Sequence, residues 1–473
     1  MCGRCQKVPS GVRCYKSLPS GSRRHRCRPP APLGPLALLR VLASNPIEAW
    51  TEAHFEQPVV AGGLPFTRAV VVSEPSAIRR VLLDNARNYE KDALQRRILS
   101  AGLANGLLSA EGARWRLQRR ALAPLFSRRN IMSFAGAVAA EAEELAAQLA
   151  TRTGAPVDMM EEATRLTLAV LERTIFSDGI GADREDVRIA MRRYFDVASR
   201  IDPFDILNLP SAIPRLRRLP VRRTVRFFER TVDAIIAARR RRCIESPTGA
   251  PQDLLTLLLN ARDPQTGEGL SQADVRANVL TFIAAGHETT ANCLTWSLYL
   301  LSQSPEWRDR VRAEAERECG RGDIGTLADR LPVTRAVIDE ANRLYPPISA
   351  ISRSALGADE LAGHRITRGT LVVIAPYVVH RHRALWTHPD GFDPSRFLPG
   401  ARETIERFAY LPFGAGPRVC IGQPFALQEA CIVLATLARC FDWRLAPDYV
   451  PRPVQKMTLR PERGLPLVLS RRN

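Results

Sequence analysis

The ten residues from Phe413 to Gly422, FGAGPRVCIG, constrain this chain more than any other segment. Three glycines and a proline around Cys420 predict a rigid, tight loop whose backbone can approach a flat partner. A helical pattern follows at once, so the positive end of its dipole and its free N–H groups lower the expected pKa of the Cys420 thiol. Because the thiolate is the form that binds metal, the segment predicts a metal-ligating cysteine. A buried cysteine in a glycine turn is the alternative interpretation.

Apolar residues at spacings of three and four predict that most of the chain is helical. The predicted helices cover residues 131–151, 161–176, 221–242, 271–303, 331–344 and 423–441. Two turn-rich segments, residues 57–81 and 352–399, contain short β runs. The predicted fold class is therefore mainly α with a minor β part. Since no Gly/Ser linker interrupts the sequence after the first thirty residues, we expect a single domain over residues 31–473.

The first thirty residues have a different composition from the rest of the chain. They contain eight basic residues and no acidic one, together with four of the ten cysteines. These cysteines are Cys2, Cys5, Cys14 and Cys27. A zinc site that also recruits His25 is one interpretation, but the spacing fits no established zinc pattern, so we expect a disordered basic leader. A targeting segment and a mis-assigned start of translation are further interpretations.

The net charge is +19, of which the leader accounts for eight units, leaving +11 for the remainder. A basic balance favours acidic proteins, anionic lipid or nucleic acid as partners. Nucleic acid ranks last because the sequence lacks a nucleic-acid-binding motif. The apolar run at residues 31–43 is interrupted by Pro35 and Arg40 and is shorter than the roughly 20 residues that a bilayer span requires. We therefore expect no transmembrane anchor and a cytoplasmic protein.

A second informative segment, AGHETT, runs from Ala285 to Thr290 in the middle of the helix predicted at 271–303. A glycine and two threonines are unfavourable inside a helix, the glycine by about 1 kcal/mol relative to alanine. A small residue would let a flat cofactor or a substrate approach the helix, and a carboxylate with a hydroxyl can relay protons. A solvated kink is the alternative interpretation.

The pattern F-G-x-G-x-R-x-C-x-G resembles the haem-binding loop of the cytochrome P450 superfamily. Three further motifs similar to those of the family lie upstream, and the resemblance covers roughly residues 30–473. These motifs are AGHETT at 285–290, Glu340-x-x-Arg343, and FDPSRF at 392–397, which contains Arg396. The resemblance implies a large helical domain with a small β-rich domain, and haem b ligated by Cys420. It also implies that Glu288 and Thr289 are a catalytic acid–alcohol pair, and that His287 is no ligand.

Glu340 and Arg343 lie three residues apart and so share one helix face. Taken alone, such a pair is most often a surface ion pair that contributes a few tenths of a kcal/mol. The resemblance instead implies a buried cluster of Glu340, Arg343 and Arg396 that supports the haem loop structurally.

The resemblance further implies cationic partners for the haem carboxylates, including Trp115 and Arg119 one helical turn apart. The cofactor-binding residues that it predicts are Trp115, Arg119, Ala285, Gly286, Arg353, Phe413, Gly414, Arg418, Cys420 and Gly422. Exposed arginines are the alternative interpretation, above all at Arg353. The predicted substrate pocket contains Leu94, Phe282, Ile348 and Met457, with apolar residues of 204–213 added. This lining favours a lipophilic substrate.

The function implied is that of a bacterial-type monooxygenase that inserts one oxygen atom of O2 into a lipophilic small molecule, such as a fatty acid or a terpenoid. Electrons are expected from a separate ferredoxin or flavodoxin with its reductase, and the protein is expected to be a monomer. Basic residues near the cysteine loop would attract the acidic partner. They are Arg114, Arg116, Arg120, Arg128 and Arg129. The alternatives are a haem-thiolate peroxygenase or isomerase, a haem-based sensor, and a zinc or nucleic-acid adaptor formed by the leader.

Overall fold

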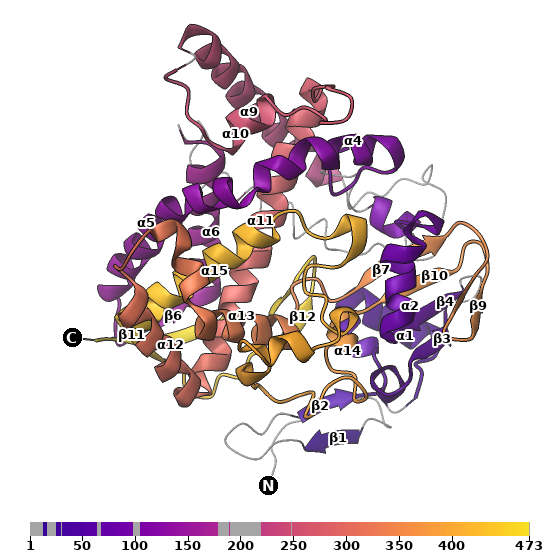
Figure 1. The fold of residues 1–473 in the computed structure, drawn as a ribbon. Helices are drawn as coiled ribbons and strands as arrows, with labels where there is room; N and C mark the ends of the chain where they lie inside the picture. The colour runs from indigo at the N-terminus through magenta and orange to yellow at the C-terminus, as the bar shows by residue number, and fades with distance from the viewer. Residues whose placement is uncertain are drawn as a thin grey trace.

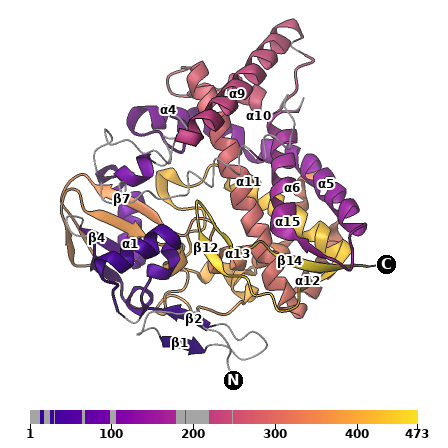
Figure 2. The same cartoon turned by 180° about the vertical axis from the view of Figure 1, so that it is seen from behind.

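A computed structural model of the chain describes residues 13–16, 25–29, 31–63, 68–97, 105–177, 189, 219–246 and 248–472. Figure 1 shows a large part made of helices and a smaller part, formed mainly by early residues and by residues 350–375, that contains a twisted sheet. Figure 2 shows the same division from behind. The predicted fold class, mainly α with a minor β part, is confirmed.

The helix α11 (Gln272–Ser302) runs through the helical part and is buried along most of its length. Ser271 begins it with a capping box, because its hydroxyl accepts from the Asp274 N–H while the Asp274 carboxylate accepts from the Ser271 N–H. Since α11 is apolar on nearly every face, helices can pack around it on several sides. Its neighbours are α6 (Met159–Ile175), α13 (Pro332–Leu344) and α15 (Gln423–Cys440), and α5 (Arg128–Ala150) packs on α6 and α15.

These boundaries agree with the helices predicted from periodicity to within a few residues. The helix α9 (Leu219–Glu245) agrees in the same way with the helix predicted at 221–242. The shorter helices were not predicted, because they contain too few turns to give a clear period. They are α1 (Pro35–Ser44), α2 (Pro75–Arg79), α4 (Gly112–Leu122), α10 (Leu254–Leu259), α12 (Pro305–Glu318) and α14 (Pro376–Val379).

The main sheet has the strand order β3-β4-β10-β7-β5. Its strands are β3 (Val59–Gly62), β4 (Ala69–Val72), β5 (Tyr89–Glu90), β7 (Ile351–Ala355) and β10 (Leu371–Ile374). The pair β10 and β4 is parallel and the other pairs are antiparallel. Because β7 follows α13 directly, the sheet holds residues 351–355 beside the helical part. The segment predicted as strand-like at 57–81 is wrong at its end, where α2 and a π-helical turn, η3 (Arg80–Asp84), replace the strand.

Smaller β elements and 3-10 turns lie outside the main sheet. A three-stranded sheet has the order β11-β14-β6, and β12 pairs with β13 and β8 with β9. The strands are β6 (Pro156–Asp158), β8 (Asp359–Leu361), β9 (His364–Ile366), β11 (Phe441–Leu445), β12 (Pro453–Gln455), β13 (Leu459–Pro461) and β14 (Pro466–Arg471). The 3-10 turns are η1 (Pro46–Ala49), η2 (Glu52–Phe55), η4 (Ala86–Asn88), η5 (Ala123–Phe126), η7 (Ile324–Arg330), η8 (Pro394–Phe397), η9 (Arg402–Thr404), η10 (Arg407–Ala409) and η11 (Gly416–Arg418).

Two short strands lie inside the basic leader, β1 (Arg13–Lys16) and β2 (His25–Arg28), and they form an antiparallel pair. Most of the leader lies outside the described residues, and the prediction that it is disordered stays a prediction. None of the helices in the described ranges is both long and apolar enough to cross a bilayer.

Candidate active site

The loop that contains Cys420 is held tightly against its own backbone and against η3. The Cys420 N–H donates to the Phe413 carbonyl over 2.9 Å, which closes the loop. Gly414 and Gly416 have φ angles of 70° and 69°, in the left-handed region that favours glycine. A Cβ on Gly416 would lie 1.8 Å from the Leu82 carbonyl oxygen, so no side chain fits there. The tight loop predicted from the glycines is confirmed.

The Cys420 thiol lies directly before α15, where the backbone N–H groups of Gly422 and Gln423 point at its sulfur. These groups and the nearby Arg119 guanidinium lower the pKa of the thiol, but desolvation by the surrounding protein has a larger effect and raises it. The expectation of a net lowered pKa is therefore wrong for the chain alone. The side chain is nevertheless exposed on one side, so the sulfur is accessible to a metal. A bound cation would favour the thiolate.

Beside the loop, Arg418 joins α4 to the cysteine segment. Its guanidinium lies over the Trp115 ring, 4.3 Å from the ring centroid, and forms an ion pair with Glu111. The same carboxylate lies 2.9 Å from the Lys91 ammonium, which is almost completely buried. Lys91 was missed in the sequence analysis, because a lone lysine after a two-residue strand gives no signal of its own. Burial lowers the pKa of Lys91 to about 8, with the positive charge of Arg418 as the next cause.

Two more predicted arginines lie within reach of this cluster. Burial, and after it the neighbouring charge of Arg418, lowers the pKa of Arg353 to about 10. Arg119 is close enough to Cys420 to lower the thiol pKa. The structure therefore brings four cationic side chains together, those of Lys91, Arg119, Arg353 and Arg418. Few carboxylates face them, and one of these, Glu111, pairs directly with Lys91 and Arg418. This surplus of partly buried positive charge fits a cofactor with two carboxylates, as haem b has.

Across from the loop, the middle of α11 has one open face in an otherwise buried helix. Ala285 is exposed and Thr289 is partly exposed, whereas residues 290–301 are buried. The Thr289 hydroxyl donates to the Ala285 carbonyl over 2.7 Å. Both residues were predicted in the site, and they share one face because they lie four residues apart. A small side chain and a hydroxyl proton are therefore presented on this open face.

Gly286 lies where α11 packs on α6. A Cβ on this residue would lie 3.1 and 3.2 Å from the two terminal methyl carbons of Leu171, which belongs to α6. The missing side chain therefore permits the close packing of the two helices. The predicted role of Gly286 at the cofactor stays a prediction.

Glu288 and His287 are both buried but differ in their surroundings. One Glu288 carboxylate oxygen lies 3.6 Å from an Arg460 guanidinium nitrogen in β13, a partner that the sequence analysis did not predict. His287 places its Nδ1 atom 3.0 Å from the Ile283 carbonyl oxygen, and burial lowers its pKa to about 4. His287 is therefore neutral and lies within hydrogen-bond distance of its own helix, and the expectation that it is no ligand stays a prediction.

The four residues predicted in the substrate pocket are not equivalent. Ile348 is exposed while the residues before it and after it are buried, and Leu94 and Met457 are partly buried. Phe282 is buried, and its ring packs edge to face on Phe126 at a centroid distance of 5.5 Å. The ring of Phe282 thus packs toward η5, and its place in the substrate pocket stays a prediction. Residues 204–213 lie outside the described residues.

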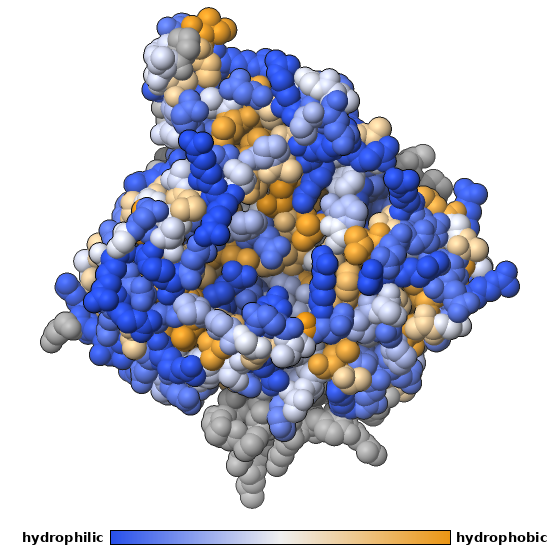
Figure 3. Space-filling model, viewed as in Figure 1, coloured by the Kyte–Doolittle hydropathy of each residue, from blue (hydrophilic) through white to orange (hydrophobic). Residues whose placement is uncertain are grey.

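Phe126 also connects α11 to the cysteine loop. A Cβ on Gly422 would lie 4.0 Å both from the Cys420 sulfur and from the Phe126 ring. Because Phe126 contacts Phe282, one turn before Ala285, the open face of α11 and the Cys420 loop belong to one neighbourhood. In Figure 3, hydrophobic side chains gather in the middle of the face shown, inside a rim of hydrophilic ones.

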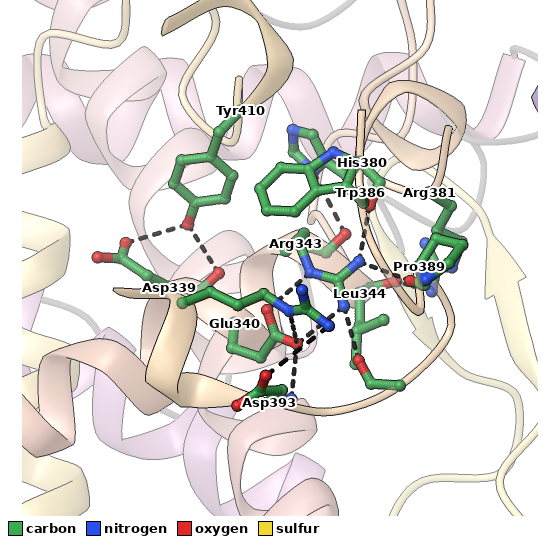
Figure 4. Close-up of polar contacts among 12 residues, drawn as sticks. Asp339, Glu340, Arg343, Leu344, His380, Arg381, Trp386, Pro389, Asp393 and Tyr410 are labelled. Atoms are coloured by element: carbon green, nitrogen blue, oxygen red, sulfur yellow. Dashed lines mark hydrogen bonds and ion pairs between the residues drawn. The ribbon is translucent and has the colours of Figure 1, made fainter. Parts of the chain in front are cut away.

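Below the loop, Glu340, Arg343 and Arg396 come together as predicted, and Figure 4 shows the contacts around the first two. The Arg343 Nε and Nη2 atoms donate to the two Glu340 carboxylate oxygens over 2.7 and 2.8 Å, and both side chains are completely buried. The Arg396 Nε atom lies 3.8 Å from Glu340, which also accepts from the Asp393 N–H. Arg343 donates in addition to the carbonyl groups of residues 380, 389 and 391. The cluster is therefore a buried support, and the surface-pair alternative is excluded.

The five arginines expected near the docking face divide into two groups. Arg114, Arg120 and Arg128 are paired with Asp274, Asp263 and Asp329. Arg116 and Arg129 are exposed, and no acidic side chain in the described part of the chain lies within ion-pair distance of them. The expectation of five available charges is therefore too large, because internal acids neutralise three of them.

Comparison with known sequences gives a consistent result. The family described as cytochrome P450 matches residues 30–468. Cyclooctatin synthase from Streptomyces melanosporofaciens is 34% identical over 403 residues, which cover 83% of this chain and 84% of that protein. Cyclooctat-9-en-7-ol 5-monooxygenase from the same organism is 35% identical over 388 residues, covering 80% and 81%. Cytokinin hydroxylase from Arabidopsis thaliana is 30% identical over 407 residues, covering 84% and 78%.

Solved structures agree with the sequence comparison. The crystal structure of a cytochrome P450, CYP102L1, has a TM-score of 0.80 and 28% identity, and the match covers 94% of this chain and 99% of that one. The heme domain of cytochrome P450DA has a TM-score of 0.78 and 28% identity, with coverage of 88% and 90%. The fold of this chain is thus similar to that of these proteins along most of its length.

Proposed function

Because this chain belongs to the cytochrome P450 family and is a P450 monooxygenase, we propose that it hydroxylates a lipophilic small molecule of the terpenoid class with haem b bound through Cys420. The observation that carries this proposal is the open face of α11, formed by Ala285 and Thr289. It follows Phe282 by one turn, and the Phe282 ring packs on Phe126, which lies next to the Cys420 loop. The names of two relatives, cyclooctatin synthase and cyclooctat-9-en-7-ol 5-monooxygenase, support a cyclic, weakly polar substrate.

The haem, when bound, supplies the activation of O2, and the protein supplies its position and the protons. Cys420 offers the thiolate, whose electron donation favours cleavage of the O–O bond. Lys91, Arg353 and Arg418 form the cationic end of the site that receives the two carboxylates. Together with the glycine loop, in which Arg418 lies, these groups would hold the cofactor and orient it.

Two residues of α11 handle protons in this proposal. The Thr289 hydroxyl holds its proton on the Ala285 carbonyl and can release it toward the reaction centre by rotating about χ1. Glu288 directly precedes it, and its carboxylate, 3.6 Å from the Arg460 guanidinium, would accept a proton from solvent and pass it on. The two residues would therefore act in sequence as a relay, with the hydroxyl as the last donor.

The substrate class follows from the residues that remain open above the site. Ile348 and Ala285 are small or apolar and exposed, and Met457 is partly buried against the core that contains Phe282. Apolar walls with few polar groups favour a substrate that is bound through its hydrocarbon skeleton. A fatty acid would additionally need a partner for its carboxylate.

Binding spectroscopy tests the proposal directly. The reduced, carbon-monoxide-bound protein is expected to give the spectrum of a thiolate-ligated haem, and Cys420→Ser is expected to lose it. Cyclic terpenoid alcohols and hydrocarbons, steroids and fatty acids are then compared by the spin-state shift that they cause. Shifts with fatty acids alone would contradict the terpenoid class. Turnover with peroxide but none with NADH and a ferredoxin system would instead favour a peroxygenase.

For electron supply we infer an acidic ferredoxin or flavodoxin that docks near α4. The two exposed arginines without an internal acid, Arg116 and Arg129, would provide the attraction. Charge reversal of both is expected to slow reduction by about tenfold at low salt and to make the rate less dependent on ionic strength. Charge reversal of Arg128, which is already paired with Asp329, is the matched control and is expected to have less effect. Equal effects of both changes would refute the docking site.

A further inference from the structure

His380 occupies an unusual position between the buried ion pair and the cysteine loop. It directly follows α14, it is completely buried, and its ring lies 5.2 Å from that of Tyr410. Its Nε2 atom lies 2.7 Å from the backbone nitrogen of Leu411, and its Nδ1 atom lies 3.3 Å from the carbonyl oxygen of Arg343. One ring therefore contacts the backbone of both segments, and Figure 4 shows it above Arg343.

The two partners determine which nitrogen of the ring carries the proton. A backbone N–H can only donate, so Nε2 must accept from Leu411 and is unprotonated. A carbonyl oxygen can only accept, so Nδ1 carries the hydrogen and donates to Arg343. Burial beside two positively charged arginines, Arg343 and Arg381, lowers the pKa of His380 to about 3 and keeps the ring in this neutral form. The ring thus acts as a fixed donor on one side and a fixed acceptor on the other.

Each partner continues into a different part of the site. On the lower side, Arg343 donates to both carboxylate oxygens of Glu340, and its Nη1 atom also donates to the carbonyl oxygen of His380 itself. On the upper side, the Leu411 carbonyl accepts from the Gly414 N–H over 3.1 Å, at the beginning of the glycine loop. The Phe413 carbonyl between them accepts from the Cys420 N–H. A continuous path of hydrogen bonds and two short backbone steps therefore leads from Glu340 to Cys420.

We propose that His380 is a positioning residue that fixes the Cys420 loop to the buried ion pair through the N–H of Leu411. Among the hydrogen bonds of the described residues, this is the one that joins a side chain of the α13–α14 region to the backbone just before Phe413. Without it, the Leu411 N–H would be buried without a partner, and the segment would move to regain one. The sulfur would then be displaced relative to the cofactor. This inference rests on the proposed binding of haem by Cys420.

Two conservative variants separate the two nitrogens. The amide of glutamine reaches the Nε2 position and can still accept from Leu411, whereas that of asparagine reaches only the Nδ1 position. His380→Gln is therefore expected to preserve the contact and His380→Asn to lose it. His382→Asn is the matched control, because His382 is also buried and nearby, but it bonds to the Gln57 carbonyl and the Ala384 N–H.

The measurement is amide hydrogen exchange at Leu411 in the full-length, haem-loaded protein, together with the carbon-monoxide spectrum. His380→Asn is expected to speed exchange at Leu411 by at least about tenfold and to raise the fraction of haem without thiolate ligation. His380→Gln and His382→Asn are expected to stay within about threefold of the wild type. Equal exchange in the Gln and Asn variants would overturn the proposal, and so would fast exchange at Leu411 with an unchanged spectrum.

Two further observations keep the test decisive. If His380→Asn does not fold, the wild type alone still tests the link. In the wild type the Leu411 amide is expected to exchange more slowly than the Ile405 amide, which bonds to Arg402 within a surface turn. Rapid exchange at Leu411 in the wild type would refute the link. A wild-type protein without a thiolate-type spectrum would instead refute the proposed function, while the exchange data would still report on the hydrogen bond itself.

Discussion

Replacing Arg343 by lysine tests the buried support of the cysteine loop most directly. The guanidinium makes five hydrogen bonds, two to Glu340 and three to the carbonyl groups of residues 380, 389 and 391. A lysine ammonium has three donors, so at least two of these buried acceptors lose their partner. At about 1–3 kcal/mol for each unsatisfied group, the free energy of unfolding should fall by about 2–6 kcal/mol.

The assay is urea unfolding of the full-length protein followed by circular dichroism, with haem retention measured on the same samples. Arg165→Lys is the matched control, because Arg165 also pairs with two glutamates but is half exposed. Its free energy of unfolding should change by less than about 1 kcal/mol. The reasoning is refuted if Arg343→Lys folds and loses no more stability than Arg165→Lys does.

Two further predictions concern the reaction face and the loop. Thr289→Ala should leave haem bound but divert O2 to peroxide, because the hydroxyl proton is lost while the helix remains. The measurement is the amount of product formed per NADH consumed. An unchanged ratio would contradict the role of Thr289. Gly416→Ala should abolish haem binding, since its Cβ would lie 1.8 Å from the Leu82 carbonyl oxygen. Gly400→Ala is the control, because Gly400 has a φ angle of 89° but open space around it. Haem absorbance of the purified proteins distinguishes the two variants. Normal haem content in Gly416→Ala would refute the clash.

The sequence predicted those parts of the site whose residues lie close together along the chain. The Cys420 loop and the pair of Glu340 and Arg343 each lie within a few consecutive residues, so spacing alone indicates which side chains meet. Lys91 was missed because it is joined to Arg418 only through the fold, by way of Glu111. No local pattern marks such a residue.

Two contacts of α11 could not be predicted from the sequence. The ring of Phe282 packs on Phe126, and a nearly uniformly apolar helix such as α11 gives no hydrophobic period from which to assign faces. The space beside Gly286 is taken by Leu171 from a helix more than a hundred residues earlier. The helices themselves were predictable because their apolar spacing extends over many turns.

The final prediction concerns acid and again involves His380. In the unfolded chain a histidine titrates near pH 6.5, whereas burial lowers the pKa of His380 to about 3 in the folded protein. Between these two values the unfolded state binds the extra proton, so stability is present above pH 6.5 and is lost as the pH falls toward 3. A difference of about 3.5 pKa units corresponds to about 5 kcal/mol.

The charged and titratable groups around the ring support the assignment of this loss to His380. Arg343 and Arg381 remain positive throughout the window, and burial raises the pKa of Tyr410 so that its phenol stays neutral. Asp339 accepts from the Tyr410 hydroxyl, and the substitution at residue 380 leaves this carboxylate in place. His380→Gln should therefore lose about 5 kcal/mol less stability between pH 6.5 and 3 than the wild type does, as measured by urea unfolding at a series of pH values. A variant of the exposed His364 should lose as much stability between pH 6.5 and 3 as the wild type does. If His380→Gln also loses as much as the wild type, the His380 ring is not the group that makes this fold sensitive to acid.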